Sequence, residues 1–184
     1  LRLSNIKQYK YDWIWDKKKG SGSMLAKVMP LKSHENISVF SIGKINYNPI
    51  YEVAKKENIR DRIKNYSKPI KNEIYGNLNG YIGTKDDIKR NPKTIISISS
   101  QEKELHQGKR LHSCQKPVAL FEYLIRTYTN EGDTVLDNCA GSFTTAIACM
   151  NTNRQYICIE KDEKYFEIGK NRIENHQPLL QAVN

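Results

Sequence analysis

The sequence predicts an α/β fold built on a parallel sheet. Two strand patterns, Asp133–Asp137 and Gln155–Glu160, alternate with two helical patterns, Thr144–Asn151 and Glu163–Glu174. The connections between the four segments are short. A strand–helix–strand–helix order with short connections requires parallel strands and right-handed crossovers. The C-terminal part of the chain therefore contains the regular part of the fold.

The sequence predicts the boundaries of one helix and the inward face of another. Pro117 opens a helix that runs to about Tyr128, because proline is preorganised for the first helical turn, and Gly132 stops the chain after it. In the last helical pattern the residues that share one stripe are predicted to face inward. They are Tyr165, Ile168, Gly169, Arg172 and Ile173.

Two further strands are predicted near the start of the chain. Residues Lys7–Asp16 alternate strictly, which is typical of a strand. Lys17–Ser23 follows and predicts a flexible basic loop, and Asn36–Ile42 predicts a second strand closed by Gly43. One face of the first strand is aromatic and contains Tyr9, Tyr11, Trp13 and Trp15.

The middle of the chain has a weaker pattern. Between Asn46 and Arg110 the apolar signal thins, and prolines and glycines divide the chain into short pieces. We expect a helix at Tyr51–Tyr66 and a strand at Thr94–Ser99. The segment therefore predicts an irregular insert rather than part of the regular sheet.

Composition limits the class of protein. A chain of 184 residues with 38% hydrophobic and 27% charged residues suits one globular domain. No apolar run approaches the length of a membrane span, and no signal-peptide pattern is present, so we expect a cytoplasmic protein. The four cysteines lack CxxC spacing and the histidines lack zinc-ligand spacing, which predicts reduced core thiols and no metal site.

The net charge of +10 is unevenly distributed. Residues 1–110 contain 23 Lys and Arg against 11 Asp and Glu, whereas residues 111–184 contain 7 against 9. A polyanion would therefore bind the first 110 residues. A solvated basic surface is the alternative interpretation of the same count.

The segment from Leu136 to Thr145, followed by the strand that ends at Glu160, indicates a nucleoside-containing cofactor. A strand, a tight glycine turn and a helix start place unpaired backbone N–H groups under an anionic group. A carboxylate at the tip of the next strand can accept hydrogen bonds from ribose hydroxyls. No G-x-G-x-x-G is present, so the turn is not a dinucleotide fingerprint.

The string Asp-Asn-Cys-Ala-Gly-Ser-Phe-Thr-Thr at 137–145 resembles the S-adenosylmethionine motif of amino-methylating DNA methyltransferases, Asp-Pro/Asn-x-x-Gly-Ser-Gly-Thr-Thr. His-Ser-Cys-Gln-Lys-Pro at 112–117 is similar to the His-Pro-x-Gln-Lys-Pro motif of that family. The resemblance extends to Asp12–Lys17 and to His34–Ile37. These blocks follow the order of the permuted class, in which the cofactor motif comes after the catalytic motif.

The resemblance implies a Rossmann-like methyltransferase sheet, incomplete at its N-terminal side, with an irregular inserted recognition region. Residues 1–45 would supply strands of the core, 46–110 the DNA-recognition insert and 111–184 the part that binds S-adenosylmethionine. It implies transfer of a methyl group to an adenine N6 or cytosine N4 amine in double-stranded DNA. The implied cofactor-binding residues are Lys116, Asp137, Ala140, Gly141, Ser142, Thr144 (with Thr145 as an alternative) and Glu160.

The resemblance also suggests DNA contacts near the first strand. Its aromatic face could stack a base swung out of the duplex, although such a face more often packs against a helix. We expect three of the four rings to be core and take Trp15 as the candidate base contact. Three lysines of the predicted basic loop are candidate phosphate contacts, which give affinity without sequence information: Lys17, Lys18 and Lys19.

Two departures from the family pattern matter. Phe143 stands where the pattern has a second glycine, so a backbone φ above zero there would be strained, and the ring adds bulk beside the expected cofactor. The catalytic motif Asp/Asn/Ser-Pro-Pro-aromatic is absent, because no two prolines are adjacent. We therefore assign no catalytic residue and expect a C-terminal portion that is inactive and marginally folded alone. A complementary N-terminal chain is a candidate partner.

Two other functions remain open from the sequence. One is a catalytically inactive DNA-binding remnant or subunit of a split methyltransferase, which the absent motif and Phe143 favour. The other is a nucleotide-dependent oxidoreductase, which the absent dinucleotide fingerprint disfavours.

Overall fold

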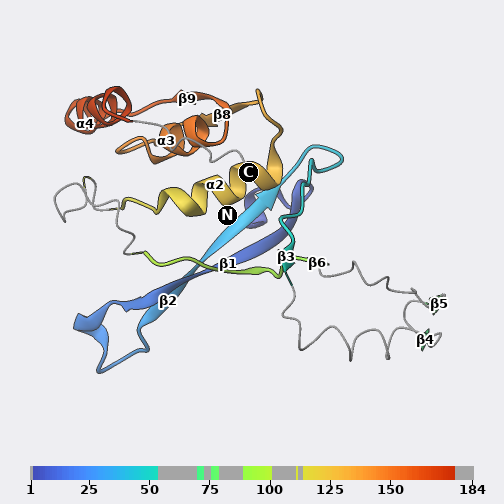
Figure 1. Ribbon diagram of the computed structural model, residues 1–184. Coiled ribbons are helices and arrows are strands. Elements are labelled where there is room, and N and C mark those ends of the chain that lie inside the picture. Colours follow the sequence, from blue (N-terminus) through green and yellow to red (C-terminus); the bar gives the residue numbers. More distant parts are fainter. Residues whose placement is uncertain are drawn as a thin grey trace. The chain divides into compact units, whose positions relative to one another are not determined.

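The computed structural model describes residues 2–53, 70–72, 76–78, 89–100, 111 and 114–176. The chain divides into two compact units, one made of Leu1–Asn48 with Lys93–Asn184 and the other of Pro49–Pro92. In Figure 1 the colours follow the chain from the N-terminus to the C-terminus. In the described residues of the larger unit these are η1 (Arg2–Asn5), β1 (Tyr9–Ser21), η2 (Ser23–Leu25), β2 (Lys32–Phe40), β7 (Ile95–Ser97), α2 (Val118–Tyr128), β8 (Thr134–Asp137), α3 (Thr144–Asn151), β9 (Gln155–Cys158) and α4 (Glu163–Glu174).

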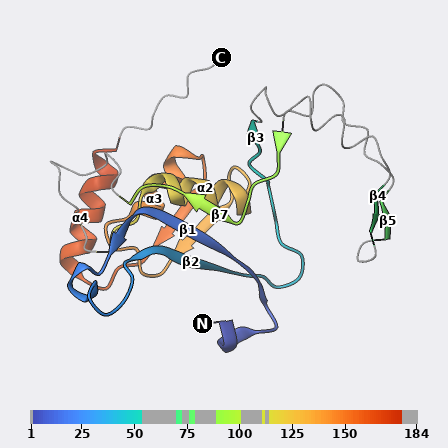
Figure 2. The same ribbon diagram turned by 90° about the horizontal axis from the view of Figure 1, so that it is seen from below.

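The first sheet has the order β2-β1-β7. β1 pairs antiparallel with β2 and parallel with β7, the strand predicted at Thr94–Ser99. Figure 2 shows β7 beside β1. Although β7 lies inside the predicted insert, it belongs to the core sheet. The alternation of the first strand is confirmed, because Trp13 and Trp15 are 3% and 2% exposed whereas Ile14 between them is exposed.

The predicted basic loop at Lys17–Ser23 is wrong for most of its length. β1 continues to Ser21, and Lys17 takes the next inward position after Trp15 with only 8% exposure. A lysine can occupy this position because Glu35 of β2 lies beside it and compensates its charge. β2 likewise begins at Lys32, four residues before the predicted start, because it pairs with this longer β1 as far as Ser21.

The predicted parallel pair is confirmed in β8 and β9. Leu136 is the register partner of Ile157, and Asp137 is the partner of Cys158. α3 and α4 have the predicted bounds, but β9 ends at Cys158, so Glu160 lies two residues beyond it. In the described residues β8 and β9 pair only with each other, so the two sheets of this unit are separate. The incomplete sheet expected from the resemblance is therefore observed.

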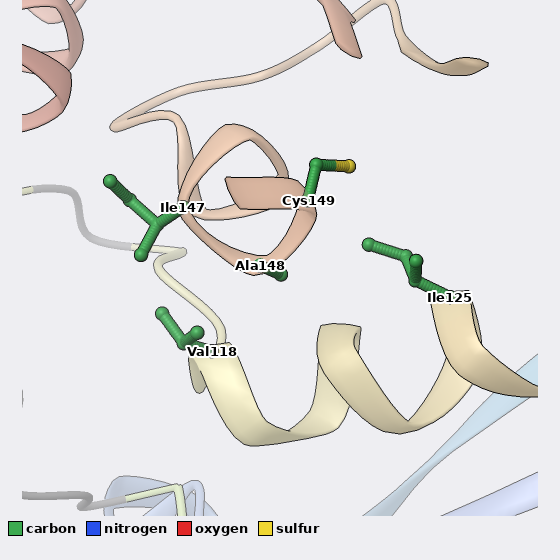
Figure 3. Packing of buried hydrophobic residues seen from close by; sticks show 5 residues of the cluster. All are labelled: Val118, Ile125, Ile147, Ala148 and Cys149. Carbon is green, nitrogen blue, oxygen red and sulfur yellow. The ribbon is translucent and has the colours of Figure 1, made fainter. Parts of the chain in front are cut away.

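Helix α2 lies between the first sheet and α3 (Figure 1). On one side Leu120 packs with Trp13 and Trp15. On the other side α2 meets α3 in an apolar cluster (Figure 3), whose buried members are Val118, Ile125, Ile147, Ala148 and Cys149. Cys149 is fully buried, and burial raises the pKa of its thiol to about 11, which keeps it a protonated core residue.

One face of the β8–β9 sheet is uncovered in the part of the chain that the structure describes. Val135, Tyr156 and Cys158 pack against the α3 clusters. The alternate residues point the other way, and Leu136, Ile157 and Ile159 are 63%, 53% and 53% exposed. Parallel sheets normally have both faces covered, so this apolar face lacks its second layer here.

In the described residues of the smaller unit there are two short antiparallel pairs: β3 (Glu52–Val53) with β6 (Lys89–Arg90), and β4 (Ile70–Asn72) with β5 (Gly76–Leu78). The helix predicted at Tyr51–Tyr66 is contradicted at its start by β3, and its remainder lies outside the described residues. No helix in the described ranges is long and apolar enough to cross a membrane.

Candidate cofactor site

The turn between β8 and α3 is held by the carboxylate with which β8 ends. Asp137 Oδ1 accepts a hydrogen bond from the Cys139 N–H at 3.1 Å, and the Thr145 hydroxyl donates to Asp137 Oδ2. Both carboxylate oxygens therefore accept hydrogen bonds from residues that follow Asp137 by no more than eight positions. Asp137 and Thr145, two of the residues singled out from the sequence, meet directly and fix the start of α3 against β8.

Glu160 connects the same turn to the adjacent strand. Its Oε2 accepts from the Gly141 N–H at 2.7 Å, and its Oε1 accepts from the Asp162 N–H at 2.9 Å. A backbone hydrogen bond also connects the turn to the segment after β9, since the Ala140 N–H donates to the Ile159 carbonyl at 3.0 Å. Gly141 has φ +54°, a conformation that favours glycine. The two predicted acidic residues therefore both accept hydrogen bonds from backbone N–H groups of one turn.

Arg172 also belongs to this site, although the sequence placed it only on the inward stripe of α4. Its Nη1 donates to the Ser142 carbonyl and to the Thr144 hydroxyl, both at 3.0 Å. Ser142 and Thr144 are 2% and 6% exposed, so the arginine satisfies polar groups that water does not reach. The sequence feature that could have indicated this role is the presence of a cation on an otherwise apolar inward stripe.

Phe143 has the strained backbone that the family pattern suggested. It is the N-cap of α3 with φ +57° and ψ +39°, the left-handed region. Its ring is 5% exposed and packs edge-to-face on Phe166 at 5.7 Å between centroids. Gly169 of α4 makes room for it, because a Cβ there would lie 2.5–2.8 Å from three ring carbons. The Phe143 ring therefore packs against α4.

Lys116, from the Gln-Lys-Pro segment, contacts the first sheet. Its Nζ donates to Glu35 Oε2 at 2.9 Å and lies 5.7 Å from the centroid of the Trp15 ring. Lys17 Nζ is 3.6 Å from the other oxygen of Glu35. Burial of Glu35 raises its pKa, but the hydrogen bond and charge of Lys116 and the charge of Lys17 outweigh it and hold the pKa below its ordinary value.

The predicted DNA contacts fall into two groups. Trp15 is buried and its indole N–H donates to the Ile98 carbonyl at 2.8 Å, so the ring is part of the core in this structure. Lys17 is buried beside Glu35, which removes it from the set of exposed phosphate contacts. Lys18 and Lys19 are exposed, although Lys18 Nζ lies 3.5 Å from Asp16.

In the described ranges no cluster of three His, Cys, Asp or Glu could hold a metal ion.

Comparison with known proteins identifies the family. The family described as DNA methylase, the N6 and N4 methyltransferases, matches residues 3–171. The chain belongs to this DNA methylase family. The resemblance that the cofactor, Gln-Lys-Pro and N-terminal blocks predicted is therefore confirmed.

Curated DNA methylase relatives match over shorter segments. Type II methyltransferase M.HpaI of Haemophilus parainfluenzae is 39% identical over 85 residues, which cover 46% of this chain and 27% of the relative. DNA adenine methyltransferase YhdJ of Escherichia coli K12 is 41% identical over 63 residues, covering 34% of this chain and 21% of the relative. The matched segments thus span between a fifth and a third of these relatives.

Two solved structures share the fold. The M1.HpyAVI–SAM complex is 26% identical with a TM-score of 0.56, and the match covers 90% of this chain and 62% of that one. PvuII DNA methyltransferase, named as cytosine-N4-specific, is 18% identical with a TM-score of 0.56, and the match covers 96% of this chain and 62% of that one. The predicted methyltransferase fold, incomplete relative to these chains, is confirmed.

The packing of Phe143 on Gly169 predicts an unusual helix mutation. Glycine to alanine inside a helix normally stabilises by about 1 kcal/mol. We expect Gly169→Ala to destabilise the chain instead, by about 1–3 kcal/mol, because its Cβ overlaps the ring. Thermal unfolding followed by circular dichroism measures the effect.

A double-mutant cycle isolates the cause. Phe143→Gly removes both the ring and the left-handed strain, so Gly169→Ala should become neutral or stabilising in that background. Asn171→Ala, at an exposed position of the same helix, is the matched control for helix propensity. Equal effects of Gly169→Ala in both backgrounds would contradict the packing argument.

Proposed function

We propose that this DNA methylase chain forms the S-adenosylmethionine-binding and DNA-contacting part of a methyltransferase that acts on an adenine N6 or cytosine N4 amine in double-stranded DNA. The observation that carries the proposal is the turn between β8 and α3, whose backbone N–H groups donate to two carboxylates. Asp137 ends β8, Glu160 lies two residues beyond the adjacent parallel strand β9, and both carboxylates bind this turn. Action on cellular DNA would place the protein in the cytoplasm.

The donor set at the turn fits S-adenosylmethionine. The cofactor has an ammonium group and two ribose hydroxyls, which need carboxylate acceptors, and a carboxylate, which needs N–H or hydroxyl donors. Glu160 would accept from the ribose hydroxyls in place of the Gly141 N–H, and Asp137 would face the ammonium group. Turn residues 140–144 would line the cofactor, whereas Lys116 binds Glu35 of the first sheet in this structure. When bound, the cofactor supplies a sulfonium methyl group for direct displacement by the amine.

The uneven charge supports DNA as the second substrate. The first 110 residues have an excess of positive charge that exceeds the net charge of the whole chain, whereas the cofactor part is slightly acidic. Exposed Lys18 and Lys19 are the phosphate contacts that we retain from the sequence prediction. Within the insert predicted at 46–110, the compact unit Pro49–Pro92 is the proposed recognition region, because β7 belongs to the core sheet.

Calorimetric titration with S-adenosylmethionine tests the proposed cofactor. We expect saturable binding by the purified chain. Asp137→Asn and Glu160→Gln should each weaken it by about tenfold to a hundredfold, the loss of a hydrogen bond to a charged group. Asp133→Asn is the matched control, because Asp133 precedes β8 at its opposite end and its carboxylate accepts from the Asn130 N–H at 2.7 Å.

Two results would contradict the proposed cofactor role. One is absence of binding by a chain whose circular dichroism and melting transition show that it is folded. The other is an equal loss of affinity in Asp133→Asn and Asp137→Asn, which would mean that the turn carboxylate has no special part in binding.

We further propose that the chain needs a complementary polypeptide for catalysis. It has no adjacent prolines, so it lacks the family's Pro-Pro motif. The apolar face of Leu136, Ile157 and Ile159 is exposed and β8 has a free edge in the described part of the chain. A segment supplying one strand and a helical layer would cover both. The same observations favour the second candidate, a DNA-binding remnant without activity.

A methyl-transfer assay separates these possibilities from an independent enzyme. We expect the purified chain to transfer no labelled methyl group from S-adenosylmethionine to duplex DNA, because the motif that binds the target amine is absent. YhdJ assayed in parallel is the positive control. Turnover by the 184-residue chain alone would contradict this proposal.

A further inference from the structure

The connection between β1 and β2 exposes an unusual number of apolar side chains. We call residues 22–31 the hairpin tip. Met24 and Val28 are 97% and 77% exposed, and three more of its large apolar residues are about half exposed: Leu25, Met29 and Leu31. In Figure 1 the tip lies at the free end of the hairpin, away from α2 and α3. An apolar cluster of this kind marks a binding surface.

The hairpin tip has an ordered backbone. The Leu25 N–H donates to the Gly22 carbonyl at 2.9 Å, and the Val28 and Met29 N–H groups both donate to the Leu25 carbonyl at 3.0 Å. Gly20 lets the two strands approach closely, since a Cβ there would lie 2.8 Å from the Leu31 Cβ. The apolar side chains are therefore presented by a folded turn.

The charge around the hairpin tip has one sign. The exposed cations are Lys18, Lys19, Lys27 and Lys32. Between Asp16 and Glu35 the sequence contains no acidic residue. An isologous contact between two copies of this tip would place the positive charges against each other, which is unfavourable. A polyanion with an apolar interior fits both the charge and the exposed side chains.

We infer that the hairpin tip is a DNA wedge, in which Met24 and Val28 contact base steps of duplex DNA while the surrounding lysines bind phosphates. Apolar wedges flanked by basic residues insert between base steps and partly unstack them. Unstacking beside a target lowers the cost of extruding a base, which an enzyme acting on an exocyclic amine requires. The inference rests on the proposed action on DNA and adds a contact outside the recognition insert.

Fluorescence anisotropy with a labelled duplex, measured over a series of salt concentrations, tests the wedge in the full chain. Met24→Ser/Val28→Ser should weaken binding about tenfold at every salt concentration, with an unchanged salt slope, because no phosphate contact is lost. Lys18→Ala/Lys19→Ala should instead reduce the slope, by about one for each lysine. Ile42→Ser, at a residue 85% exposed outside the tip, is the matched control and should bind as the wild type does.

Several outcomes would overturn the wedge. Unchanged DNA affinity of Met24→Ser/Val28→Ser would do so, as would an equal loss in Ile42→Ser. A wild-type dimer that becomes monomeric in the double variant with unchanged DNA affinity would assign the tip to a second copy instead. A wild-type chain that binds S-adenosylmethionine but no DNA would overturn the wedge and leave the cofactor proposal standing, because the cofactor is measured separately.

Discussion

The turn that follows β8 depends on three charged side chains that reach it from different elements. Asp137 holds it from the end of β8, Glu160 from beyond β9 and Arg172 from α4. Asp137 accepts from the Cys139 N–H, Glu160 accepts from the Gly141 N–H and Arg172 donates to the Ser142 carbonyl, so the side chains satisfy backbone groups of the turn. The direction in which α3 leaves the sheet follows from these contacts. Hence the same residues that would meet a cofactor also determine the shape of its site.

Phe143 shows how this turn differs from the family pattern without losing its shape. A left-handed phenylalanine costs about 1–2 kcal/mol relative to glycine. Burial of its ring against Phe166, in the space left by Gly169, offsets that cost. The ring joins α3 to α4 at the point where Arg172 also crosses. The departure therefore has a structural partner in the same chain, and its effect falls on the packing of α4.

Local pattern predicted much of this fold. The alternation around Trp13 and the apolar runs before Asp137 and Glu160 predicted the strands. These signals depend on the periodicity of apolar residues and on the turn residues, which are local properties of the sequence. The extension of β1 through Lys17 was missed, because it depends on Glu35, eighteen residues away, and on pairing with β2. The role of Arg172 was missed for a similar reason, since its partners Ser142 and Thr144 lie thirty and twenty-eight residues before it. Long-range ion pairs and caps leave little trace in sequence periodicity.

We infer that the turn is formed by the chain itself before any cofactor binds. Amide hydrogen exchange of Gly141, measured by NMR in the ligand-free chain, tests it most directly, because this N–H donates to Glu160. We expect exchange at least about a hundredfold slower than in an unfolded peptide, because the amide is structured. Exchange at the unfolded rate that slows only when S-adenosylmethionine is added would contradict it and show that the cofactor orders the turn.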